Sequence, residues 1–234
     1  PFRRRARNRY RRDLLFRQHQ RQCRRRQSWR HRDERRQRRQ RVPGSSGGIK
    51  RDCIGIAVDR QRRRDKLLGG YLDGRQWRAV IAESFTFENV RLVSQAVASY
   101  LLDAAEPGAP LEIVIGFDTR FLSDRFAAEV ARVMAANGIT AYLARADAPT
   151  PAISYNIVHK KAAGGVMITA SHNPPRYSGY KVKAAYGGSA PKHQTQAIAQ
   201  KLYAIHDSFG ANLMDFKLAE ERGLIRKFDP AWPY

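Results

Sequence analysis

Between residues 85 and 205 the chain alternates between short apolar runs and longer segments in which apolar side chains recur every three or four positions. Short runs are typical of buried β-strands, and the longer spacing is typical of helices with one buried face. Residues 111–117 are almost wholly apolar, as expected for a strand covered on both sides. Strands and helices in turn predict an α/β fold, in which helices cover both faces of one sheet.

Three helices are expected between the strands, and residues with known preferences mark their ends. The first opens at residues 85–87. Ser123 is expected to cap the second helix and Gly138 to end it. Thr150-Pro151 has the cap-then-proline form of a third helix start. The side chains expected to face the core are Val90, Val93, Val97, Leu101, Phe126, Val130, Val133, Met134, Ile153, Ile157 and Val158.

Three more strands and a closing helix complete the expected fold. The strands are residues 139–143, 165–168 and 180–182, and the helix is residues 192–205. The strand at 165–168 leads directly into a polar loop at 169–176. Loops at the carboxyl ends of strands are where α/β sheets bind ligands, so this loop is the first place to look for chemistry.

The loop reads Thr-Ala-Ser-His-Asn-Pro-Pro-Arg and places the hydroxyl of Ser171 outside regular structure. In the simpler interpretation, Ser171 lies in an ordinary polar turn and has no chemical role. In the functional interpretation it is a nucleophile, although a free hydroxyl is a poor one. It needs a base, or it must already carry the group to be transferred. No Ser-His-Asp order or G-x-S-x-G turn surrounds Ser171, which disfavours a hydrolase.

Residues 169–174 resemble the phosphoserine loop of the α-D-phosphohexomutases, the superfamily that contains phosphoglucomutase and phosphomannomutase. Residues 77–82, 116–120 and 150–155 are similar, in order and spacing, to the rest of that superfamily's first domain. The resemblance extends from Trp77 to the C-terminus. It implies a three-layer α/β/α sandwich with a mixed sheet.

The resemblance also implies an activity, the interconversion of hexose 1-phosphate and hexose 6-phosphate. Ser171 would be held as phosphoserine and would give its phosphoryl group to a hexose monophosphate. The hexose 1,6-bisphosphate would turn around and return its other phosphate to Ser171. Glucose is the first choice of hexose, with mannose and glucosamine left open. The implied cofactors are a hexose 1,6-bisphosphate activator and Mg²⁺, bound through Ser171 and through aspartates that this sequence lacks.

Four residues are implied in catalysis by their places in these motifs. Besides Ser171, Lys181 lies where the family has a general acid/base for the sugar hydroxyl. Arg78 lies where the family has a guanidinium at the transferring phosphate. His172 is expected to shape the loop or contact phosphate, since adjacent residues in a turn often point apart.

Three further residues are expected to bind substrate or phosphate: Asn173, Arg120 and Lys183. Each has a simpler interpretation. Asn173 can fix the turn through its own backbone. Arg120 can pair with Asp118 and brace the serine loop. Lys183 is the weaker of the two lysine candidates, because lysines in a strand after a loop are mostly solvated.

Residues 1–70 differ sharply in charge from the rest of the chain. They hold 26 Lys and Arg against 6 Asp and Glu, a net charge of +20, whereas residues 71–234 hold 18 against 15, a net charge of +3. Such a segment can bind nucleic acid or another anionic surface, or remain disordered. A third interpretation is an out-of-frame translation, because no lysine precedes Lys50 and the family's Gly-Thr-x-Gly run is missing before Trp77.

The expected domains are therefore residues 1–70, an Arg-rich segment; 71–212, the phosphohexomutase domain; and 213–234, a linker or the start of a truncated second domain. On this interpretation the polypeptide alone has little mutase turnover. The alternative function is a non-enzymatic protein whose basic arm binds nucleic acid or an acidic partner. No apolar run approaches the roughly 20 residues needed to cross a bilayer, and we expect a soluble, cytoplasmic protein.

Overall fold

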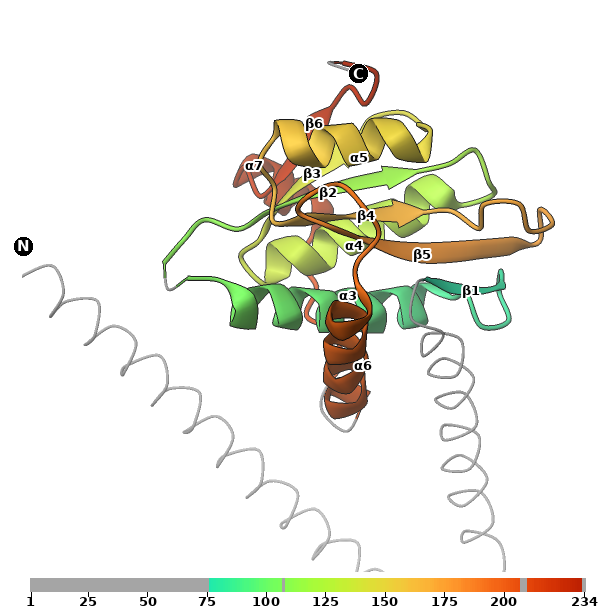
Figure 1. Ribbon diagram of the computed structural model, residues 1–234, viewed down its shortest axis with the longest axis horizontal. Coiled ribbons are helices and arrows are strands. Elements are labelled where there is room, and N and C mark those ends of the chain that lie inside the picture. Colours follow the sequence, from blue (N-terminus) through green and yellow to red (C-terminus); the bar gives the residue numbers. More distant parts are fainter. Residues whose placement is uncertain (1–75, 107, 207–209, 233–234) are drawn as a thin grey trace, which may run out of the picture. The chain divides into compact units, whose positions relative to one another are not determined.

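A six-stranded mixed sheet forms the centre of the fold (Figure 1). The computed structural model describes residues 76–106, 108–206 and 210–232, so the interpretations of residues 1–70 lie outside it. The strand order is β1-β5-β4-β2-β3-β6, and β5 runs antiparallel to both of its neighbours while the other pairs are parallel. The strands are β1 (Trp77–Val80), β2 (Glu112–Phe117), β3 (Thr140–Ala144), β4 (Gly164–Ile168), β5 (Tyr177–Ala184) and β6 (Ile225–Phe228). The predicted α/β fold is confirmed.

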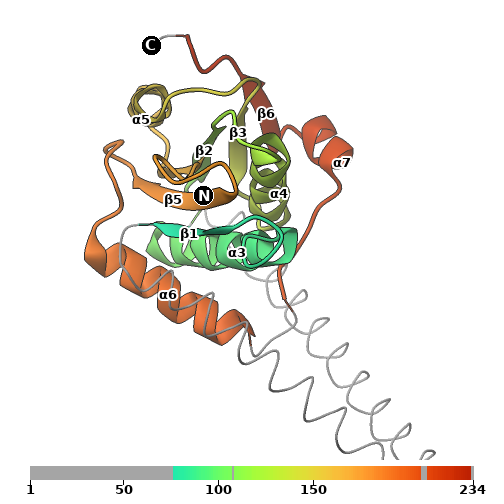
Figure 2. The same cartoon turned by 90° about the vertical axis from the view of Figure 1, so that its right-hand side faces the viewer.

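Helices cover both faces of this sheet (Figure 2). Helices α3 and α4 pack on one face, with α6 against α3, and α5 packs on the other. The helices are α3 (Phe87–Ala104), α4 (Ser123–Ala136), α5 (Thr150–His159), α6 (Lys192–His206) and α7 (Phe216–Glu221). None of the helices in the described ranges has the length and apolar character required to cross a bilayer.

The larger core, between the sheet and α3 and α4, fixes the position of β1 and β5. The ring of Phe85 stacks on Trp77 at 4.7 Å between centroids and meets Phe126 edge-on at 4.8 Å. On β5, the buried hydroxyl of Tyr180 pairs with Ser94 of α3 at 3.1 Å, and burial raises the pKa of Tyr180. These contacts anchor the two strands that carry the basic side chains of the site.

Two expected helix caps and one expected core residue were wrong. Leu122, with φ of 61°, precedes α4, and Ser123 donates its hydroxyl to Asp118 instead of capping the helix. Thr150 lies inside the first turn of α5, after Pro149, and makes no side-chain cap. Val158 is 53% exposed because it lies toward the outer side of α5. The other expected core residues are buried, and Gly138 follows α4 with φ of 77°.

Residues 213–234 were expected to form a linker or the start of a truncated second domain; their described part contributes β6 to the same sheet and the helix α7 beside it. Strand β6 pairs in parallel with β3, and Ile225 of β6 and Ala219 of α7 are buried in the larger core. The sequence Ile-Arg-Lys-Phe is four residues long with only one fully buried side chain, too short for a pattern to predict a strand. The described domain therefore extends beyond residue 212.

If β6 is part of the core, Ile225→Ala lowers the free energy of unfolding by about 2–4 kcal/mol, because it leaves a cavity under the edge strand. The matched control is Lys227→Ala on the same strand, whose exposed ion pair with Glu220 contributes no more than about 1 kcal/mol. Urea denaturation of both variants measures the difference. Equal losses for the two variants would show that β6 does not pack on the core.

Candidate active site

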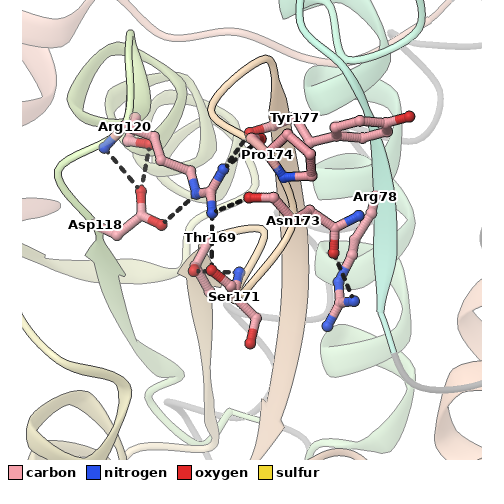
Figure 3. A network of polar contacts seen from close by, with 9 residues as sticks. Arg78, Asp118, Arg120, Thr169, Ser171, Asn173, Pro174 and Tyr177 are labelled. Carbon is pink, nitrogen blue, oxygen red and sulfur yellow. Dashed lines mark hydrogen bonds and ion pairs between the residues drawn. The ribbon is translucent and has the colours of Figure 1, made fainter.

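The serine loop leaves the carboxyl end of β4 and returns into β5 (Figure 3). Ser171 is exposed and has a left-handed backbone, with φ of 58°. For a residue with a side chain this conformation costs about 1–2 kcal/mol. It is held by the hydrogen bond from the Ser171 N–H to the Thr169 hydroxyl, at 3.0 Å, and by the Asn173 N–H to Ala170 O, at 3.2 Å. The loop thus holds the hydroxyl in one exposed position.

Arg120 braces this loop from the turn that follows the neighbouring strand β2. Its Nε donates to Asp118 at 3.1 Å, and its two terminal nitrogens donate to backbone carbonyls of the loop. The accepting carbonyls are those of Pro174 (2.9 Å), Tyr177 (3.0 Å), Ser171 (2.8 Å) and Asn173 (2.8 Å). A guanidinium has five N–H donors, and all five are used. These contacts favour the bracing role of Arg120 over direct phosphate binding.

Asp118 orients the guanidinium in turn. Its carboxylate accepts the Nε of Arg120, the backbone N–H of Arg120 at 3.1 Å and the Ser123 hydroxyl at 2.8 Å. The Asp118 N–H donates to Ile168 O at 3.1 Å, which joins the ends of β2 and β4. The expected ion pair is present, and Ser123 extends it to the start of α4.

Three basic side chains lie on the face of the sheet that α5 covers. Arg78 of β1 is paired with Gly179, Lys181 with Met167, and Lys183 with Gly165. Directly paired residues, and residues two apart in a strand, point to the same face. Met167 belongs to the core on the α5 side, so the three cations share that side.

Arg78 reaches the serine loop through Asn173. Its Nη1 donates to the Asn173 side-chain oxygen at 3.0 Å, while the Asn173 carbonyl accepts from Arg120, so this residue lies between the two arginines (Figure 3). The side chain of Asn173 bonds Arg78 and not its own backbone, which was the simpler interpretation of this residue, and its binding of phosphate stays a prediction. The Nε of Arg78 is buried without a partner among the described residues.

The environment of Lys181 favours its neutral amine. Partial burial lowers its pKa, and the like charge of Arg78 lowers it further. Desolvation penalises an ammonium more than an amine, and a nearby cation acts in the same direction. An amine with a lowered pKa is suited to general base catalysis near neutral pH.

The other two candidates are less well placed. His172 is exposed in the loop and makes no hydrogen bond with the described residues. Lys183 is 7% exposed, and its ammonium donates to Gly187 O at 3.2 Å, farther along β5 from the loop. The contact with Gly187 does not favour Lys183 as a phosphate ligand, and the role of His172 stays a prediction.

The structural role of Gly179 was not predicted from the sequence. A Cβ at this position would lie 2.5 Å from the carbonyl oxygen of Thr169 and 3.0 Å from that of Trp77. Only glycine lets β5 approach both chains so closely beside Arg78. The signal was available, because a glycine inside a strand often marks a close backbone approach.

Residues 71–208 match the model of the family described as phosphoglucomutase/phosphomannomutase, alpha/beta/alpha domain I. The chain belongs to this family. The resemblance noted in the sequence is confirmed, and the described part of the match carries the serine loop and all three basic residues of the sheet.

Individual relatives agree with the family match. A phosphoglucomutase of Staphylococcus saprophyticus is 36% identical over 137 residues, 58% of this chain and 24% of that protein. A probable phosphomannomutase of Haemophilus influenzae is 48% identical over 115 residues, 46% of this chain and 23% of that protein. A putative phosphomannomutase structure from Thermus thermophilus aligns with a TM-score of 0.57 and 34% identity, over 67% of this chain and 32% of that one. The chain matches about a quarter of the length of these curated relatives.

The described residues do not by themselves make a magnesium site. In the ranges that the structure covers, no three His, Cys, Asp or Glu side chains are grouped to hold a metal ion. Mg²⁺ requires about six oxygen ligands in octahedral geometry, and Ser171 supplies one oxygen.

Replacing Arg120 by lysine tests the brace, because an ammonium keeps the charge but lacks the planar five-donor geometry. We expect Arg120→Lys to lower the free energy of unfolding by about 2–4 kcal/mol. It also speeds hydrogen exchange at the loop amides of Asn173 and Tyr177, measured by NMR. Arg125→Lys, at an exposed position of α4, is the control and leaves both unchanged. Unchanged exchange at these amides in Arg120→Lys would contradict the bracing role.

Proposed function

We propose that this chain carries the phosphoryl-accepting domain of a phosphohexomutase, in which Ser171 holds and passes on the phosphoryl group. The observation that carries the proposal is the arrangement of the loop. An exposed serine is held in a left-handed conformation at the end of β4, and Arg78 bonds the same loop. The family match and the relatives named phosphoglucomutase and phosphomannomutase support it.

In the forward step, phosphoserine 171 meets a hydroxyl of a hexose monophosphate. The neutral amine of Lys181 takes the hydroxyl proton, and the sugar oxygen forms a bond to phosphorus. The bond from phosphorus to Ser171 Oγ breaks, and its electron pair stays on Oγ, which is the nucleophile of the return step. The product is a hexose 1,6-bisphosphate. After it turns around, Ser171 Oγ attacks its other phosphorus, and the departing sugar oxygen recovers the proton from the Lys181 ammonium.

Electrostatics explains why cations surround the serine. Phosphoserine carries a charge of about −1.5 to −2 at neutral pH, and the sugar phosphate adds more. Positioning and charge stabilisation supply most of the catalysis of phosphoryl transfer. In this proposal Arg78 stabilises the transferring group, while Arg120 acts only through the loop that it braces.

Glucose is the hexose that we propose, from the resemblance of the loop to the phosphoglucomutase and phosphomannomutase branches. Magnesium, held by the phosphoserine and by carboxylates outside the described residues, would neutralise phosphate charge when bound. The nucleic-acid alternative depends on residues 1–70, which lie outside the described ranges, and the relatives add nothing to it.

Incubation of the purified chain with glucose 1,6-bisphosphate and Mg²⁺ tests the proposal. We expect mass spectrometry to find one added phosphoryl group, located by peptide mapping at Ser171. Ser171→Ala abolishes the labelling, and Ser189→Ala, at an exposed turn after β5, leaves it unchanged. Labelling that persists in Ser171→Ala, or no labelling of folded chain, would overturn the proposed function.

A further inference from the structure

Lys183 is a buried cation for which the proposed reaction has no use. It is 7% exposed, and its hydrogen bond goes to a neutral acceptor, the carbonyl of Gly187. Within the described residues, neither Lys183 nor Lys181 forms an ion pair with a carboxylate. Lysine is almost never fully buried unless it is paired, because desolvating an unpaired charge is costly. A buried lysine kept without an acid partner calls for a physical explanation.

The geometry of β5 supplies one. Lys181 and Lys183 lie two residues apart on one face of the strand, so their Cα atoms are separated by roughly 7 Å at the usual rise per residue. On the other side of Lys181, toward β1, lies Arg78, opposite Gly179. Lys181 is therefore placed between two cations along the face that α5 covers.

Other charged groups do not offset this arrangement in the described elements that pack there. Strand β4 has no titratable side chain, and α5 has Tyr155 and His159, whose rings stack at 6.0 Å. The turn after β5 contributes Tyr186, whose hydroxyl donates to Ser189 O at 2.7 Å. None of these side chains is a carboxylate that would offset the charges of Arg78 and Lys183.

The ammonium of Lys183 is also fixed in place. Gly187, its acceptor, has a φ of 79°, and a Cβ there would lie 2.6 Å from Ser154 O and 3.2 Å from Val158 of α5. The turn is thus packed closely against α5, and its carbonyl holds the ammonium at the end of β5 far from the serine loop. Lys183 acts on Lys181 by its electric field rather than by contact with substrate.

We infer that Lys183 is a positioning residue for Lys181: a fixed, buried positive charge that favours the neutral amine of Lys181, and a tether for the turn after β5. The inference rests on the proposed role of Lys181 as general acid/base. It assigns Lys183 no contact with phosphate or sugar. Burial and the charge of Lys181 lower the pKa of Lys183 itself.

NMR titration of the full chain with ¹³C-labelled lysine side chains tests the inference without requiring turnover. The Lys181 signal is assigned from its loss in Lys181→Met, and the exposed Lys217 serves as an internal reference. In the wild type we expect Lys181 to titrate below the ordinary range of a lysine, because burial and Arg78 lower its pKa. In Lys183→Met the pKa of Lys181 rises by about one to two pH units, the order of shift expected for removing a neighbouring unit charge at a partly buried site.

Two further variants separate charge from structure. Lys183→Arg keeps the charge and leaves Lys181 titrating as in the wild type. Lys183→Gln keeps a donor for Gly187 O without the charge, and we expect it to raise the pKa of Lys181 as Lys183→Met does. This variant therefore tests the inference even if Lys183→Met does not fold. An unchanged Lys181 titration in folded Lys183→Met or Lys183→Gln would overturn the inference. Failure of Ser171 labelling would leave this titration unaffected, so the two proposals fail separately.

Discussion

The hydrogen bonds of Arg120 are the interaction on which the site depends. A loop between antiparallel strands has carbonyl groups with no strand partner, and four of them here accept from one guanidinium. Asp118 fixes that guanidinium from the end of β2 and is itself held by Ser123. Without this support, only two hydrogen bonds within the loop, those of the Ser171 and Asn173 N–H groups, would hold the strained left-handed backbone of Ser171.

The second constraint is electrostatic. Strand pairing puts Arg78, Lys181 and Lys183 on one side of the sheet, with no carboxylate paired to the two lysines in the described ranges. Such a face is destabilising by itself, since like charges in a poorly solvated setting repel. A doubly charged phosphate at Ser171 would relieve that repulsion.

The sequence predicted most of the fold because its main elements bury continuous apolar surface. Helices α3 and α4 and strands β2 and β4 follow the expected pattern, with side chains such as Val90, Phe126 and Val166 fully buried. Strand β6 was missed because it is an edge strand with two exposed basic residues. The cap at Ser123 was wrong because Asp118, five residues earlier, offers its hydroxyl a charged acceptor.

The candidate site was predictable in its residues but only partly in its contacts. The motif placed Ser171, Lys181 and Arg78 together, and strand register brings the two basic side chains to one face. It did not predict that Asn173 bonds Arg78, or that Lys183 turns to Gly187, because both contacts depend on how the chain folds back over distances that local patterns do not encode.

The most direct measurement of the central claim is the pKa of a phosphoserine incorporated at position 171, followed by ³¹P NMR on the folded chain. A serine loop placed beside Arg78 and Lys181 to hold a dianion predicts a second phosphate pKa clearly below the value of about 6 that free phosphoserine shows. In Arg78→Gln we expect the second phosphate pKa to return toward that value, because the charge of Arg78 is gone. A phosphate that titrates as it does in an unfolded peptide, in both proteins, would contradict the claim.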